Sequence, residues 1–130
     1  MGEFNRFTGI FIFMYSQAIE KCPWGAWAIL EDTPTYKVKK ISVNPGHRLS
    51  YQKHFKRKED WFIIEGEALV TLNDQDIVIK AGEFIHIPCE ALHRIKNISE
   101  STTLIFIEIQ RGSYFGEDDI VRISDDYGRV

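Results

Sequence analysis

Four side chains with the donor atoms of a metal site lie in two separate segments of the sequence. Gln52 and His54 are two residues apart, so on a β-strand they project from the same face, and Glu59 can return beside them from the start of the following strand. His93 comes from a second segment and follows Pro88 closely. One amide oxygen, two imidazoles and one carboxylate can enclose a divalent ion and leave room for water or substrate. We therefore expect one divalent metal ion, held by Gln52, His54, Glu59 and His93.

Such a site needs strands to position it, and the sequence beyond residue 35 supplies them. Short β-rich runs are separated there by turn residues such as Asn, Pro and Gly. Runs repeated every roughly 8–12 residues with turn signals between them are typical of an all-β sandwich or barrel. No sustained helical periodicity is present, although residues 115–123 could form a short helical turn. The expected strands are Tyr36–Val43, Trp61–Ile64, Ala68–Leu72, Ile77–Ile79, Phe84–Ile87, His93–Lys96 and Thr103–Gln110.

One of these runs, Thr103–Gln110, is apolar on both faces, which fits a strand inside a sandwich better than one facing water. Glu108 interrupts it. This carboxylate either points into a polar cavity or lies near the solvated end of the strand, and the solvated end is slightly favoured.

Composition indicates one ordinary globular domain. The chain has 130 residues, of which 44% are hydrophobic and 27% charged. The formal net charge is -3, with both signs spread along the sequence, and this argues against a nucleic-acid partner. The one basic cluster is short and interrupted, and by itself it indicates a solvated loop: Lys53, Lys56, Arg57 and Lys58.

The N-terminal stretch and the cysteines set expectations about location. Gly9–Tyr15 is too short to span a bilayer and lacks the basic flank of a signal peptide, so we expect no membrane association. We interpret it as an added strand within an N-terminal extension, residues 1–20, before a barrel domain of residues 21–130. An added strand of this kind can pair with a neighbour's sheet edge, so a homodimer is expected. Two cysteines are too few for a disulfide framework, which favours the reducing cytoplasm.

The spacing of the metal-site residues resembles the two sequence motifs of the cupin superfamily. Every interval matches in both motifs, with Gln52 in place of the first His and Glu90 in place of a Gly. The resemblance implies a small double-stranded β-helix (jelly-roll) barrel. The first motif is matched by Gly46, Gln52, His54, Glu59 and Gly66, and the second by Gly82, Pro88, Glu90, His93 and Asn97.

A closer resemblance covers Lys21 to Arg129 and is to the type II mannose-6-phosphate isomerase domain. In that family the domain usually forms the C-terminal part of a fused mannose-1-phosphate guanylyltransferase. This sequence has no nucleotidyltransferase half, so guanylyltransferase activity is not implied. The segments that carry the likeness are Pro23–Gly25, Tyr36–Gly46, Leu49–His54, Arg57–Trp61, Gly112–Arg122 and Asp125–Arg129.

The resemblance implies zinc as the metal and the interconversion of mannose 6-phosphate and fructose 6-phosphate as the reaction. A proton must then move between two sugar carbons, and Glu108 and Lys53 are the candidate bases. The sugar phosphate, the expected small-molecule partner, would contact Ser50, Arg57 and Arg122. Two alternatives stay open. One is a metal-binding cupin that acts on or binds another sugar or sugar phosphate. The other is an iron-dependent cupin dioxygenase, because iron also accepts two histidines and a carboxylate.

Overall fold

The computed structural model describes residues 2–5, 10–13 and 18–130. Within these ranges every regular secondary-structure element is a β-strand, so the prediction of an all-β chain is confirmed. In the same part of the chain, no helix is long and apolar enough to cross a membrane. Strands β1 (Gly2–Asn5) and β2 (Ile10–Phe13) pair antiparallel. The expected added strand Gly9–Tyr15 contains β2, and its residues 9, 14 and 15 lie outside the described ranges.

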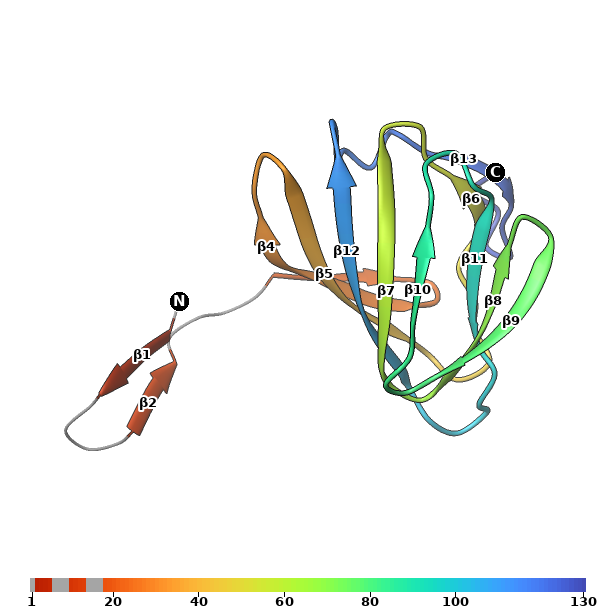
Figure 1. Ribbon diagram of the computed structural model, residues 1–130. Helices are drawn as coiled ribbons and strands as arrows, with labels where there is room; N and C mark the ends of the chain where they lie inside the picture. Colours follow the sequence, from red (N-terminus) through yellow and green to blue (C-terminus); the bar gives the residue numbers. More distant parts are fainter. Residues whose placement is uncertain (1, 6–9, 14–17) are drawn as a thin grey trace.

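The remaining strands form two antiparallel sheets that face each other (Figure 1). The six-stranded sheet has the order β10-β7-β12-β5-β4-β3, and the five-stranded sheet has the order β13-β6-β11-β8-β9. Neighbouring strands in these orders are often far apart in sequence, which brings the two predicted metal-ligand segments together. The strands are β3 (Ile19–Cys22), β4 (Gly25–Asp32), β5 (Tyr36–Val43), β6 (Tyr51–Lys53), β7 (Arg57–Glu65), β8 (Glu67–Leu72), β9 (Gln75–Lys80), β10 (Phe84–Ile87), β11 (His93–Asn97), β12 (Leu104–Gly112) and β13 (Val121–Ser124).

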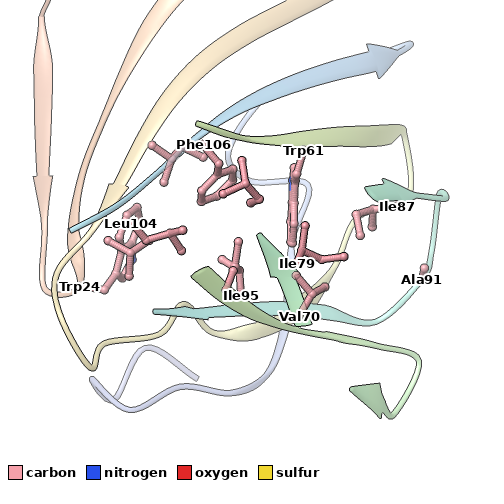
Figure 2. Packing of buried hydrophobic residues seen from close by; sticks show 13 residues of the cluster. Trp24, Trp61, Val70, Ile79, Ile87, Ala91, Ile95, Leu104 and Phe106 are labelled. Carbon is pink, nitrogen blue, oxygen red and sulfur yellow. The ribbon is translucent and has the colours of Figure 1, made fainter. Parts of the chain in front are cut away.

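The hydrophobic core lies between the two sheets (Figure 2). Alternate residues of each strand point inward because side chains in a β-strand alternate between faces. Phe106 from β12 and Trp61 from β7 meet there with ring centroids 5.4 Å apart. Val70 and Ile95, from β8 and β11, close the core from the other sheet and are fully buried. Burial of these side chains supplies the main stabilisation of the barrel.

The inward-facing residues change from apolar to polar along three adjacent strands. On the inward face of β7, the apolar Ile63 and Trp61 lie at one end and the polar Glu59 and Arg57 at the other, and all four are buried. In β12 the apolar pair is Leu104 and Phe106, and the polar pair is Glu108 and Gln110. In β5, Val43 and Ile41 are apolar and Lys39 is the polar residue at the same end. Since these strands are neighbours in register, the polar residues form one layer at one end of the core. This layer is where the site is built.

Asn97, the last residue of the second cupin-like motif, has a structural role at the opposite end. Its side-chain nitrogen donates to the carbonyl oxygens of Val43, at 3.0 Å, and Thr102, at 2.7 Å. Its oxygen accepts from the backbone N–H of Ser99 at 3.0 Å. A fully buried amide with these bonds ties β11 to β5 and to the turn before β12.

Two local expectations were wrong. Residues 115–123 contain no helix: one turn is closed by the bond from the Asp119 N–H to the Gly116 carbonyl oxygen, and Val121 and Arg122 then pair with Lys53 and Gln52 of β6. Glu108 does not lie at a solvated strand end: it is 6% exposed and belongs to the polar layer. In both places the structure depends on pairing between strands that are distant in the sequence, and local sequence does not encode such pairing.

Candidate metal centre

The structure brings His54, Glu59 and His93 together in the polar layer. Each offers one ligand atom, and these atoms all lie within 4.8 Å of one another. His54 follows β6, Glu59 faces inward from β7, and His93 begins β11, so both sheets contribute. All three are at most 4% exposed. The prediction that these three residues form a cluster able to hold a divalent cation is confirmed.

Backbone carbonyls orient both imidazoles. Nδ1 of His54 donates to the carbonyl oxygen of Asp119 at 2.6 Å, and Nδ1 of His93 donates to that of Ala91 at 2.9 Å. Because a carbonyl oxygen only accepts, each Nδ1 carries the proton, and Nε2 keeps its lone pair in the neutral ring. Nε2 of His54 lies 3.4 Å from Oε2 of Glu59, and Nε2 of His93 lies 3.9 Å from Oε1. Histidines that ligate metals are commonly oriented in this way.

The protonation states suit a cation. Burial raises the pKa of Glu59, but the neighbouring His93, Arg57 and His54 outweigh it and hold this pKa at about 2. Burial lowers the pKa of His54. At neutral pH the cluster therefore presents an ionised carboxylate and a neutral His54 imidazole, the forms that bind metals.

One atom of the cluster has no protein partner. Nε2 of His93 is buried and makes no hydrogen bond. Leaving a buried acceptor unpaired costs about 1–3 kcal/mol, so such groups usually have a ligand or water. The orphaned nitrogen, beside a carboxylate and a second imidazole, shows that the residues present fit a divalent ion.

Gln52, the fourth predicted ligand, is placed on the same face as the cluster. It is paired directly with His93 across β6 and β11, and directly paired residues project to the same side. It also lines the cavity described below. Its part as a ligand stays a prediction.

Arg57 lies within the cluster and not at its rim. It is 5% exposed, and its Nε donates to Oε2 of Glu59 at 2.8 Å. Its Nη2 donates to Nε2 of His54 at 3.2 Å. The basic segment around Arg57 is therefore not simply a solvated loop: this residue points inward while Lys56 is exposed. Gly112, opposite Arg57, allows the close strand contact, since a Cβ there would meet the Lys56 carbonyl oxygen at 2.1 Å.

A cavity of about 110 Å³ reaches the cluster through Arg57 and Gln52, while His54, Glu59 and His93 are not among its lining residues. All three residues predicted to contact a phosphorylated substrate line it, namely Ser50, Arg57 and Arg122. Nη1 of Arg57 and Nε of Arg122 are buried there without a hydrogen-bond partner. Because both side chains line the cavity, their guanidinium groups can bind an anion there.

The two candidate bases are placed differently. Glu108 lines the cavity and accepts a hydrogen bond from Nε2 of Gln110 at 2.7 Å. Burial and the nearby Glu59 raise the pKa of Glu108 to about 8. Lys53 is not among the residues that line the cavity, and its ammonium lies 5.1 Å from the centre of the Phe55 ring. The catalytic roles themselves stay predictions.

Sequence reasoning missed several residues of the cavity wall. Lys39 is 4% exposed, bonds Glu117 at 2.6 Å and lies over the Trp27 ring at 4.0 Å. Its inward position was detectable, because it alternates with Ile41 and Val43 in β5. Glu117 lies in a loop, and no local pattern marks it.

Comparison with known proteins identifies the group to which the chain is similar. Residues 15–125 match the family model described as mannose-6-phosphate isomerase C-terminal. The chain is 43% identical over 108 residues to xanthan biosynthesis protein XanB of Xanthomonas campestris, covering 83% of the chain and 23% of that relative. It is 42% identical over 108 residues to mannose-1-phosphate guanylyltransferase ManC of Salmonella typhimurium, covering 83% and 22%. It therefore spans less than a quarter of the length of these relatives.

Solved structures agree on the fold. The capsular polysaccharide assembling protein CapF from Staphylococcus aureus matches with a TM-score of 0.75 and 19% identity, over 87% of this chain and 36% of that one. A Klebsiella pneumoniae protein with a double-stranded β-helix domain matches with a TM-score of 0.65 and 20% identity, over 73% and 75%. The predicted cupin barrel is confirmed.

The predicted mannose-6-phosphate isomerase activity is wrong. Full-length relatives about 40% identical to this chain are named mannose-1-phosphate guanylyltransferase, which is a nucleotidyltransferase and not an isomerase. The physical reason is that the motifs encode a barrel and a ligand set, and one fold supports many reactions. Motif spacing therefore gives the cluster correctly but does not determine the chemistry performed beside it.

Proposed function

The chain belongs to the family of mannose-6-phosphate isomerase C-terminal domains, and we propose that it is the metal-binding cupin module of a mannose-1-phosphate guanylyltransferase system. In this proposal the module binds mannose 1-phosphate in the cavity beside the metal centre. It would thereby contribute to the synthesis of activated mannose, from which surface polysaccharides are made. Relatives named for xanthan and alginate biosynthesis support that setting.

The observation that carries the proposal is the pairing of a cation site with an anion site. His54, Glu59 and His93 supply the first, and the guanidinium groups of Arg57 and Arg122, which line the cavity, supply the second. A sugar phosphate needs both kinds of contact, because its phosphate is anionic and its hydroxyl oxygens are ligands for metals. Ser50, 1% exposed, adds a hydroxyl to the same wall.

We propose zinc as the ion. Two imidazoles and one carboxylate form a common zinc ligand set, and the amide oxygen of Gln52 would complete it. When bound, the ion supplies positive charge that orients and polarises sugar oxygens. Trp61, which is buried with its ring 5.5 Å from that of His93, would keep water from the apolar side of the site, and the arginines would hold the phosphate.

Calorimetric titration with mannose 1-phosphate tests the proposal. We expect the zinc-loaded chain to bind mannose 1-phosphate, and Arg122→Gln to weaken binding by about tenfold or more, the effect of losing a charge-assisted hydrogen bond. Arg48→Gln is the matched control, because Arg48 pairs with Asp126 on the surface, at 2.7 Å, and does not line the cavity. It should change the affinity by no more than about twofold.

Two outcomes would contradict this function. One is the absence of mannose 1-phosphate binding by the zinc-loaded chain. The other is equal binding of unphosphorylated mannose, which would show that the arginines do not recognise a phosphate.

A further inference from the structure

Arg57 makes hydrogen bonds to the atoms that a metal ion would use. Its Nε donates to Oε2 of Glu59 at 2.8 Å, and its Nη2 donates to Nε2 of His54 at 3.2 Å. The Nε2 lone pair of His54 can bond one partner only, either the guanidinium or a metal ion. The guanidinium and the ion are therefore alternatives at this atom.

Electrostatics strengthens this exclusion. Glu59 is 2% exposed, and an uncompensated buried carboxylate would be costly, so Arg57 neutralises it while no metal is bound. A divalent ion replaces that compensation and repels the guanidinium, because two cations a few ångströms apart in a buried site interact strongly. The same carboxylate thus has two cationic partners that compete.

Two carboxylates and the cavity lie close to the Arg57 guanidinium and could receive it after displacement. Its Nη2 already lies 3.9 Å from Oε1 of Glu108, and its Nη1 lies 3.9 Å from Oε1 of Glu117. Nη1 is buried without a hydrogen-bond partner, and the residue lines the cavity. A small movement away from His54 and Glu59 would turn the free donors of Arg57 toward an anion in that cavity.

We propose that Arg57 couples the two halves of the site: metal binding displaces its guanidinium from His54 and Glu59 into the cavity, where it binds the phosphate of the ligand. The inference rests on the proposed function for the identity of that anion. Because coupling is reciprocal, the metal tightens phosphate binding and phosphate tightens metal binding by the same factor.

Zinc titration against a fluorescent zinc chelator, with and without mannose 1-phosphate, tests the coupling. In the wild-type chain, mannose 1-phosphate should tighten zinc binding by about fivefold or more. Arg57→Met keeps an unbranched side chain but removes the competing donors. It should bind zinc about tenfold more tightly than wild type in the absence of sugar phosphate. Adding mannose 1-phosphate should then tighten its zinc binding clearly less than in wild type, because only the direct contact between the sugar oxygens and the ion remains.

Arg57→Lys provides a second variant in case the methionine side chain prevents folding. It keeps the charge but cannot bridge two ligand atoms with a planar fork, so its zinc affinity should lie between those of wild type and Arg57→Met. Zinc binding that is unchanged or weaker in both variants would overturn the coupling. Tightening by mannose 1-phosphate that is as large in Arg57→Met as in wild type would do the same.

The failure of the proposed function gives a different result. If the wild-type chain binds zinc but not mannose 1-phosphate, the proposed binding of a sugar phosphate is wrong. The competition between Arg57 and zinc is still decided by the zinc affinities measured without sugar phosphate.

Discussion

Glu59→Gln should reduce zinc affinity by about 100-fold or more, because removing a ligand costs at least as much as removing a residue that only orients one. Glu59 is the only anionic member of the cluster, and Gln keeps its shape while removing the charge. The same substitution leaves Arg57 buried without its closest counter-ion, 2.8 Å away. In chelator, where metal plays no part, the free energy of unfolding should therefore fall by about 3–5 kcal/mol. Competition titration and urea unfolding measure the two effects.

Glu117→Gln is the matched control for this experiment. Glu117 is also a carboxylate facing Arg57, at 3.9 Å, but it lies outside the metal cluster and its side chain is 56% exposed. Its zinc affinity should stay within about threefold of wild type, because Glu117 offers no atom to the cluster and its charge is half-exposed and partly screened. Tight, stoichiometric zinc binding by Glu59→Gln would remove Glu59 from the ligand set.

Glu108→Gln should stabilise the metal-free protein, and the gain should increase with pH. Burial and the charge of Glu59 raise the pKa of Glu108 from 4.5 to about 8. The folded state therefore holds a proton that the unfolded state releases above pH 4.5, so stability falls as pH rises towards about 8. Gln keeps the acceptor for Gln110 and needs no proton. At pH 8 the gain should be on the order of 2–4 kcal/mol.

The experiment compares urea unfolding of wild type and Glu108→Gln in chelator, from pH 5 to pH 9. The difference between the two proteins isolates Glu108, because the opposite pH dependence of His54, whose pKa burial lowers, is common to both. Glu117→Gln again serves as control. Lys39 and Arg57 hold the pKa of the half-exposed Glu117 down against its partial desolvation, so removing that carboxylate should bring no gain with pH. A constant difference for Glu108→Gln across the range would show that its pKa is not raised.

Much of the fold and the centre of the site followed from the sequence. The bounds of β5 and β10 were predicted to the residue, since both are bounded by turn residues. The metal cluster followed from residue spacing together with the resemblance to the cupin motifs, which singled out His54, Glu59 and His93.

The parts that could not be predicted depend on pairing between distant strands. Composition placed Arg57 in a solvated basic loop and the family resemblance made it a substrate contact, and the register of β7 against β12 shows that it faces inward. Glu108 was assigned to a solvated end because local sequence does not reveal the polar layer around it. The reaction was misassigned for a related reason, since ligand spacing does not specify which molecule enters the cavity.

Crystallographic anomalous scattering tests the metal centre most directly. Crystals grown with one equivalent of zinc, measured on both sides of the zinc absorption edge, should show one strong anomalous peak. We predict that it lies within about 2.0–2.2 Å of Nε2 of His54, Nε2 of His93 and an oxygen of Glu59. No peak between these atoms, or a peak held only by surface residues, would contradict the metal centre and the function proposed from it.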